Sequence, residues 1–191
     1  MKKSILVEVS ARHVHLTKHD LEVLFGEGYE LKKEKDLSQP GQFASTEVVS
    51  IVGPKRRLDG VRILGPCRSH SQVEVSRSDC FYLGANAPLR LSGKIIGSGA
   101  VTLLGPKGEL ALKEGLIVAK RHLNVDSNFA HGLGLSAGQN ISIEIEGPRA
   151  TIFNEVEVCF VEESEPIVYL DTDEAGAAGI NENILECRIK S

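Results

Sequence analysis

The 191-residue sequence lacks several features that would assign it to common protein classes. It has no apolar run near the roughly 20 residues that a membrane-spanning helix needs, and we see no signal-peptide core after its first residues. It also lacks a P-loop and a G-x-G-x-x-G motif after a predicted strand. These absences argue against a membrane protein and against P-loop or Rossmann-type nucleotide enzymes.

Paired cysteines and excess positive charge are missing as well. The four cysteines, at positions 67, 80, 159 and 187, form no C-x-x-C motif and suggest no disulfide framework. Free thiols in a reducing cytosol are the simplest interpretation. The net charge of -4 and a pI of about 5.9 argue against a general nucleic-acid binder. With 41% hydrophobic and 25% charged residues, the composition is typical of a folded chain.

Most of the chain alternates between apolar and polar residues in short segments that are separated by Gly-Pro turns. Strands are predicted at residues 5–10, 48–52, 61–64, 72–75, 101–104, 117–119, 141–145 and 156–161. Short helices are predicted at residues 18–25, 128–133 and 173–178, with Thr17 and Thr172 as N-caps of the first and last. Many short strands at this spacing favour barrels or sandwiches over a parallel α/β sheet.

A faint internal repeat links the two halves of the chain. Residues 9–15 (VSARHVH) resemble residues 118–124 (VAKRHLN), and in both copies a predicted strand runs into Arg-His and then a short helix. A repeat this short can also arise by chance. We interpret it as two related halves, joined near residues 86–98. The expected fold is mainly β, with two small β-barrel domains (residues 1–90 and 91–191) and short capping helices.

The most informative short motif is His-x-His, formed by His13 and His15. Side chains at positions i and i+2 of an extended segment point the same way, so the two imidazoles would face one cavity. Zinc-type metals bind neutral imidazole readily. The alternative is that both histidines cap nearby polar groups or lie exposed. Arg12 and the second Arg-His copy at His122 favour the metal.

Glu74 and Arg68 are further site candidates. Glu74 lies in a strand-like run whose neighbouring valines face the other way, so it is either exposed or in a polar pocket. Arg68 follows a Gly-Pro turn, where a guanidinium either clamps a phosphate or is merely solvated. Cys67 beside Arg68 could act as a thiolate nucleophile, but a core or turn cysteine is the favoured interpretation.

A basic cluster stands out in this acidic chain. It consists of Lys55, Arg56, Arg57 and Arg62. The cluster either receives the phosphates of a nucleotide-like cofactor or forms an ordinary solvated hairpin, and the residues alone do not decide between the two.

Four ordered segments together resemble the PduL-type phosphate propanoyltransferases. They are residues 9–16 (VSARHVHL), 35–43 (KDLSQPGQF), 64–77 (LGPCRSHSQVEVSR) and 171–175 (DTDEA). The resemblance spans about residues 5 to 190. It implies two β-barrel domains with short helical caps and a phosphotransacylase, an acyltransferase that interconverts acyl-CoA plus phosphate with acyl phosphate plus coenzyme A. It also implies two metal ions, usually zinc.

Carried over by position, the resemblance assigns a role to several residues. It implies that the first metal is held by His13, His15 and Glu74, and that Arg68 is the catalytic residue that holds phosphate. It also implies coenzyme A contacts from Val9, Ser10, Ala11, Lys55 and Arg62, and an aromatic contact to adenine from Phe81.

The second metal site departs from the family pattern. The family has Arg-His-x-His where this chain has His122 followed by Leu and Asn124, and it has a histidine where this chain has Tyr169. Asn124 and Tyr169 could still act as metal ligands beside His122, or the site is empty, differently loaded or lost. A coenzyme A-contacting asparagine of the family is also replaced here, by Gly176.

The resemblance thus implies metal-assisted attack of phosphate on a short-chain acyl-CoA, either propanoyl-CoA or acetyl-CoA, without an acyl-enzyme. Two alternatives stay open. One is a catalytically impaired homologue that binds coenzyme A or acyl phosphate as a partner or regulator; the other is a related metal-dependent acyl transfer or hydrolysis with a different acceptor. Neither the acyl chain nor a homodimer can be derived from the residues.

The expected location is the cytoplasm. Family members that enter bacterial microcompartments carry an extra amphipathic N-terminal segment. Because the first predicted strand begins near Ile5, we expect no such segment and a protein outside the shell.

Overall fold

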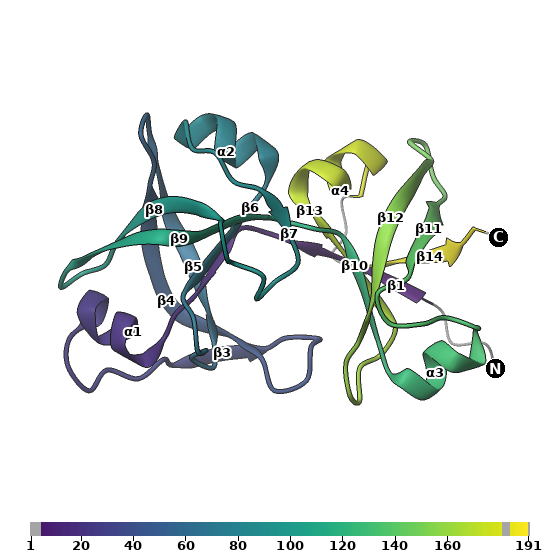
Figure 1. Ribbon diagram of the computed structural model, residues 1–191, viewed down its shortest axis with the longest axis horizontal. Coiled ribbons are helices and arrows are strands. Elements are labelled where there is room, and N and C mark those ends of the chain that lie inside the picture. The colour runs from purple at the N-terminus through teal and green to yellow at the C-terminus, as the bar shows by residue number, and fades with distance from the viewer. Residues whose placement is uncertain (1–4, 181–183, 191) are drawn as a thin grey trace. The chain divides into compact units, whose positions relative to one another are not determined.

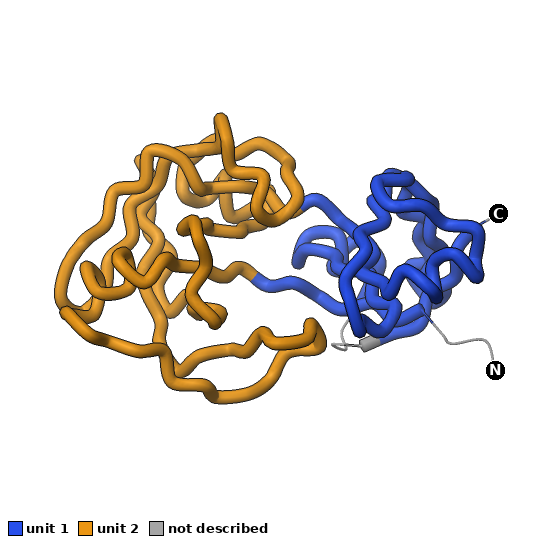
Figure 2. Tube along the Cα trace, turned by 60° about the horizontal axis from the view of Figure 1, so that its bottom comes forward, with its two compact units in different colours: residues 1–11, 120–191 blue, residues 12–119 orange. Residues whose placement is uncertain are grey.

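The computed structural model describes residues 5–180 and 184–190, and in it the chain forms two compact units. Unit 2 consists of residues 12–119, and unit 1 combines residues 1–11 with residues 120–191 (Figure 2). Both units are built mainly from β-strands, and four short helices lie within the described ranges (Figure 1).

Unit 2 contains a closed barrel of six strands. They are β2 (His13–His15), β4 (Phe43–Val52), β5 (Arg57–Gly65), β6 (Gln72–Val75), β8 (Gly99–Leu104) and β9 (Glu109–Ala119). Their pairing follows the cyclic order β4-β5-β2-β6-β9-β8, and β8 returns to β4. Unit 2 also contains β3 (Lys33–Asp36), β7 (Leu89–Arg90), α1 (Lys18–Phe25) and α2 (Arg77–Leu83).

Unit 1 contains the other closed barrel. Its strands are β1 (Ile5–Ser10), β10 (His122–Val125), β11 (Asn140–Ile145), β12 (Thr151–Phe160), β13 (Ile167–Asp171) and β14 (Ile184–Ile189). They pair in the order β1-β13-β10-β12-β11-β14. The helices of unit 1 are α3 (Ser127–Gly132) and α4 (Thr172–Ala178). The prediction of a mainly β fold with two small barrels and short helices is therefore confirmed.

The two barrels match strand for strand. In unit 2, β2 runs parallel to β5 and antiparallel to β6, and β6 runs parallel to β9. In unit 1, β10 runs parallel to β12 and antiparallel to β13, and β13 runs parallel to β1. Strands β8 and β4 correspond in the same way to β14 and β11. This correspondence supports the duplication inferred from the sequence repeat.

The leading strand of each repeat completes the barrel of the other repeat. Along the chain β1 runs into β2, yet it pairs with β13 and β14 in unit 1. Likewise β9 runs into β10, yet it pairs with β6 and β8 in unit 2. For this reason the units divide at residues 11/12 and 119/120, whereas the sequence repeat predicts a single boundary between residues 90 and 91.

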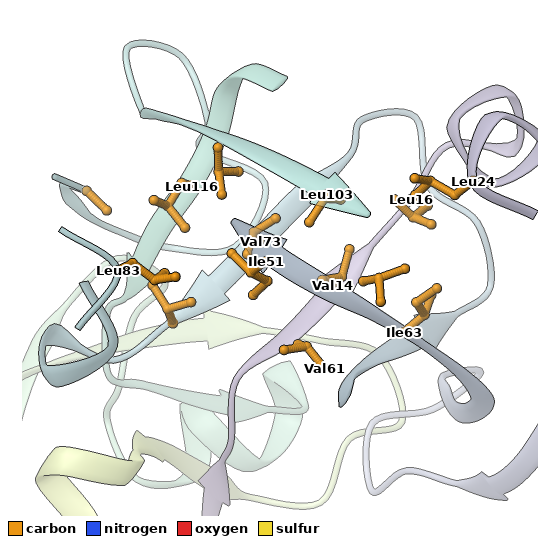
Figure 3. Packing of buried hydrophobic residues seen from close by; sticks show 14 of the residues in the cluster. Val14, Leu16, Leu24, Ile51, Val61, Ile63, Val73, Leu83, Leu103 and Leu116 are labelled. Atoms are coloured by element: carbon orange, nitrogen blue, oxygen red, sulfur yellow. The ribbon is translucent and has the colours of Figure 1, made fainter. Parts of the chain in front are cut away.

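Each barrel encloses its own apolar core. In unit 2, fully buried side chains from the barrel strands and both helices converge (Figure 3); among them are Val14, Leu16, Leu24, Ile51, Ile63, Val73, Leu83, Leu103 and Leu116. A second cluster fills unit 1. Because successive side chains of a strand point to opposite faces, the inward position of Val14 directs His13 and His15 to the other face of β2.

Capping residues fix where the helices begin. Thr17 caps α1 as predicted. Thr172 does not cap α4, because it is the first helical residue and the side chain of Asp171 accepts the capping hydrogen bond instead. Helix α2 was not predicted, although Ser76 and Asp79 form a capping box at its N-terminus. Within the described ranges, no helix is long and apolar enough to cross a membrane.

Candidate metal and anion site

His13, His15 and Glu74 form a buried cluster on one side of the unit 2 barrel. Register pairing of the antiparallel strands β2 and β6 places His13 directly opposite Glu74. The Oε1 atom of Glu74 lies 3.4 Å from Nε2 of His13 and 3.9 Å from Nε2 of His15. One donor atom from each residue lies within 4.8 Å of the others, and all three residues are buried.

Burial and neighbouring charges set the protonation of this cluster. Burial, together with His13 and Arg68, lowers the pKa of His15 to about 3, although Glu74 acts in the opposite direction. Burial also opposes ionisation of Glu74, but the adjacent His13 and a hydrogen bond from Ser92 hold the pKa of this carboxyl well below its usual range. A neutral imidazole therefore lies beside a carboxylate, which is the form in which both bind a metal ion.

A hydrogen-bond network holds Glu74 in place. The side-chain amide of Gln72 donates to Glu74 Oε1 at 2.6 Å, and the Ser92 hydroxyl donates to the same oxygen at 2.8 Å. The backbone N–H of Gly93 in turn donates to Gln72 Oε1 at 2.7 Å. Neither Gln72 nor Ser92 was predicted. Gln72 could have been found, because it lies two residues before Glu74 on the same face of β6.

Arg68 reaches this network from the segment before β6. Its Nη1 donates to Ser92 Oγ at 3.0 Å and its Nη2 to Gln42 Oε1 at 3.1 Å. Burial lowers the pKa of Arg68, although Glu74 opposes this effect. The Ser92 hydroxyl thus contacts both the Arg68 guanidinium and the Glu74 carboxylate. A group that can bind an anion is therefore linked through one side chain to a group that can bind a cation.

The unit 2 cluster fits a bound transition metal. Two imidazoles and one carboxylate are the donor set of many catalytic zinc sites, in which a fourth position is left for water or substrate. Hydrogen bonds from Gln72 and Ser92 to Glu74 supply the outer contacts that usually orient a metal-binding carboxylate. His13, His15 and Glu74 are therefore the residues that would hold the ion.

The other predicted metal ligands lie at the corresponding position of unit 1. His122 is directly opposite Tyr169 across β10 and β13, as His13 is opposite Glu74. The two rings of this pair stack, with centroids 5.3 Å apart and an interplanar angle of 23°. Burial, with the nearby charge of Glu8, raises the pKa of Tyr169, which therefore stays a neutral phenol. Asn124, at 4% exposed, completes the set.

The residues predicted to contact coenzyme A are distributed over both units. Val9 and Ser10 end β1 and pair with β13, and Ala11 is the exposed residue that follows. Lys55 is exposed in the hairpin between β4 and β5. Arg62 lies opposite His13, and its guanidinium donates to the backbone carbonyl of Ser45 and pairs with Glu34.

The remaining aromatic and basic candidates gather near α2. Phe81 is 86% exposed on this helix, which leaves its ring available for stacking. The guanidinium of Arg56 lies 4.9 Å from the centre of the Tyr82 ring. Gly176, the substituted position, lies within α4 of unit 1.

Two potential nucleophiles do not fit a catalytic role. Burial raises the pKa of Cys67, and the residue packs against the unit 2 core, so the core interpretation is favoured over a reactive thiolate. A G-x-S-x-G spacing places Ser136 at its centre, but this exposed serine lies between α3 and β11. A nucleophile elbow instead connects a strand to a following helix.

An arginine–carboxylate pair recurs in both barrels. The guanidinium of Arg12 bonds both oxygens of Asp79, at 3.0 Å and 2.8 Å. In unit 1, Arg121 pairs with Glu174 at 2.9 Å. Each pair ties the residue before the histidine to the capping box of a helix. The arginine of each Arg-His motif therefore has a structural role, which the sequence alone did not distinguish from a role in the site.

Comparison with known proteins assigns the family. The sequence pattern of the family described as phosphate propanoyltransferase matches residues 6–181. A phosphate propanoyltransferase from Thermotoga maritima is 46% identical over 178 residues, which cover 93% of this chain and 85% of that protein. One from Priestia megaterium is 48% identical over 178 residues, covering 93% and 82%. The chain belongs to the phosphate propanoyltransferase family.

By homology, the chain is an enzyme of the phosphate propanoyltransferase family. A further member, from Lachnoclostridium phytofermentans, is 47% identical over 178 residues, covering 93% of this chain and 83% of that protein. The region matched by the family includes both Arg-His copies, the unit 2 cluster and Arg68. The family match therefore includes parts of both barrels. The resemblance first seen in four short segments extends over nearly the whole chain.

Proposed function

We propose that the enzyme interconverts a short-chain acyl-CoA and phosphate with an acyl phosphate and coenzyme A, at the unit 2 cluster. The observation that carries the proposal is the Ser92 hydroxyl, which links the guanidinium of Arg68 to the carboxylate of Glu74. An anion-binding side chain beside a metal-type donor set suits a reaction between phosphate and a thioester. Acetyl and propanoyl chains differ by one methylene, and both are candidate substrates.

Arg68 is the residue proposed to bind phosphate. Its guanidinium presents planar donors that match phosphate oxygens, and its two present partners, Ser92 and Gln42, are neutral. Their hydrogen bonds fix the fork before substrate arrives, which reduces the ordering that binding requires. The positive charge also offsets the repulsion between phosphate and the phosphates of coenzyme A.

The proposed reaction is direct displacement. A phosphate oxygen attacks the thioester carbonyl carbon, a C–O bond forms, the C–S bond breaks, and the coenzyme A sulfur leaves as a thiolate that takes up a proton. Arg68 orients the attacking phosphate, while His13, His15 and Glu74 would hold the metal ion. When bound, such an ion supplies Lewis-acid stabilisation of negative charge on oxygen. No side chain needs to carry the acyl group.

We propose that Lys55 and Arg62, the basic residues to which the family resemblance gives this role, bind coenzyme A. Lys55 is exposed and its backbone N–H is fixed by the carbonyl of Leu83 at the end of α2. The exposed Phe81 lies on the same helix and offers a stacking face to adenine. Arg62 is proposed to exchange its ion pair with Glu34 for a ligand phosphate.

The deciding experiment is a thioester-cleavage assay. Loss of thioester absorbance is followed with acetyl-CoA and with propanoyl-CoA, with and without phosphate, and after chelation and return of zinc. We expect cleavage that requires phosphate and yields acyl phosphate, and that falls when the metal is removed. Cleavage that proceeds equally without phosphate would favour a hydrolase, and binding of coenzyme A without turnover would favour the non-catalytic alternative.

Substitutions test the assigned residues. Arg68→Ala is expected to lower kcat/KM by roughly 100-fold or more, because a preorganised charge beside the reacting groups is lost. Arg188→Ala is the matched control, since Arg188 is an exposed arginine in unit 1 whose partner, Glu146, is also exposed. Equal activity of both variants would remove Arg68 from the proposed site.

A further inference from the structure

The strand registers place one row of four residues across each barrel at equivalent positions. In unit 2 the row crosses β9, β6, β2 and β5 and consists of Ile117, Glu74, His13 and Arg62. In unit 1 it crosses β1, β13, β10 and β12 and consists of Glu8, Tyr169, His122 and Glu157. Only the histidine is common to both rows.

We propose that the enzyme binds one metal ion per chain, in unit 2, and that the equivalent position in unit 1 is metal-free and occupied by the stacked pair of His122 and Tyr169. This inference rests on the metal site of the proposed function. It concerns the chemistry of the residues at the second position, where the duplicated fold is retained but the donor atoms have changed.

The donor set at the second position is poor for a transition metal. Tyr169 stands where Glu74 stands in unit 2, so a phenol replaces a carboxylate. Asn124 stands where His15 stands, two residues after the shared histidine, so an amide replaces an imidazole. One imidazole remains, whereas zinc sites ordinarily use three or four strong protein donors.

Ring geometry also differs between the two positions. The His13 and His15 rings meet edge to face, at 85°, and their Nε2 atoms both approach the Glu74 oxygen. The His122 ring instead lies nearly flat against Tyr169, and its Nδ1 lies 2.9 Å from the carbonyl of Lys120. The Tyr169 ring thus takes the place beside the shared histidine that the Glu74 carboxylate takes in unit 2.

The carboxylates of the unit 1 row do not restore the lost donors. Glu157 is paired with Lys120 at 2.7 Å. Glu8 lies opposite Tyr169, and β13 separates it from the strand of His122. Its buried Oε2 has no hydrogen-bond partner within the described part of the chain, but no other described His, Cys, Asp or Glu donors converge with it into a group of three. Among the described residues, the one group of three converging His, Cys, Asp or Glu donors is that of unit 2.

The test counts bound metal in the full chain. Purified protein is stripped with a chelator, dialysed against zinc or against manganese, freed of loose ions, and analysed by elemental mass spectrometry. We expect one equivalent of zinc per chain in the unaltered protein and in His122→Ala, and close to none in His13→Ala. Circular dichroism checks that both variants are folded, and His122→Ala controls for loss of a histidine from an equivalent position.

The outcomes separate the inference from the proposed function. Two equivalents of either metal, with one lost in His122→Ala or Glu8→Gln, would overturn the inference and leave the unit 2 site intact. No bound metal in the unaltered protein would overturn the metal in the proposed function and, with it, the inference.

A gain-of-site variant tests the reason for the difference. The double substitution Asn124→His and Tyr169→Glu places the unit 2 donor types at the equivalent unit 1 positions. A second equivalent of zinc in this variant supports the argument from donors. A folded double variant that still binds one equivalent would contradict it, because some feature other than the donor set would then exclude the metal.

Discussion

The hydroxyl of Ser92 donates a hydrogen bond of 2.8 Å to Glu74 and accepts one of 3.0 Å from Arg68. Ser92 lies 18 residues after Glu74 in sequence, in the segment between β7 and β8. It is exposed, whereas Glu74 is 6% exposed. The contact therefore joins a buried carboxylate to a residue at the protein surface.

Substitution of Ser92 is expected to weaken metal binding without unfolding the protein. Ser92→Ala removes one of the hydrogen bonds that orient the Glu74 carboxylate, and loss of such an outer contact typically lowers metal affinity about 10–100-fold. Titration with zinc against a competing chelator measures the change. Ser50→Ala, which removes an exposed hydroxyl bonded to Asp59, serves as control. Unchanged affinity in Ser92→Ala would show that the network does not support the metal.

A conservative change of Arg68 is expected to separate charge from geometry. Arg68→Lys keeps the positive charge but cannot reach Ser92 and Gln42 with a planar fork. We expect the KM for phosphate to rise by about 10-fold, equivalent to roughly 1.4 kcal/mol, with a smaller change in the KM for acyl-CoA. Steady-state kinetics with each substrate varied in turn provide the measurement. An increase confined to acyl-CoA would place Arg68 elsewhere in the reaction.

Loss of the Cys67 thiol is expected to leave turnover nearly unchanged. Burial raises the pKa of this thiol, so little thiolate is present at neutral pH, and the proposed displacement needs no acyl-enzyme. Cys67→Ser should therefore retain kcat within about twofold. Mass spectrometry of enzyme quenched during turnover should show no added acyl group. An acylated Cys67 peptide, or a ping-pong kinetic pattern, would contradict direct displacement.

The two helix-capping carboxylates are expected to differ in their contribution to stability. Asp79 is 5% exposed and bonds Arg12 through both oxygens. Asp79→Ala removes this two-point contact and the partner of the Ser76 backbone N–H, although Ser76 still caps α2, and we expect a loss of about 1–3 kcal/mol. The equivalent Glu174 is more exposed and bonds Arg121 through one oxygen, so Glu174→Ala should cost less. Urea unfolding, with probes that report separately on the two units, compares them. A larger loss for Glu174→Ala would contradict this ranking.

Several elements of the fold follow from local sequence signals, namely the alternation of apolar and polar residues and helix-capping residues. Alternation predicts β1 and β6 with the observed bounds, and Thr17 predicts the start of α1. The sequence missed the strands β2, β3, β7, β10, β13 and β14 and the helix α2. Strand β13 is buried at four of its five residues, so it does not show a clear alternation. Strands of two to four residues carry too few alternations to stand out. Helix α2 does carry a local signal, the capping box of Ser76 and Asp79, which was not recognised.

The sequence indicated His13, His15 and Glu74 as candidate metal ligands, but it did not indicate the contacts that join them. The His-x-His spacing alone directs His13 and His15 to the same side of an extended segment. The sequence did not decide whether Glu74 faces the two histidines or solvent. A polar residue between two valines in a strand is compatible with both orientations. The register of β2 against β6 decides it, by placing Glu74 directly opposite His13.

The sequence by itself determined that this protein has two copies of an Arg-His strand motif, that one copy carries two imidazoles and the other one, and that the fold is built from short strands. These properties depend on residues a few positions apart, whose side-chain directions are set by backbone geometry. Only the tertiary structure decided that the leading strand of each repeat, β1 or β9, completes the barrel of the other repeat. It also decided that Gln72 and Ser92 bond Glu74, and that Arg68 bonds Ser92. Those relationships depend on hydrogen bonding between distant segments, which no local periodicity encodes.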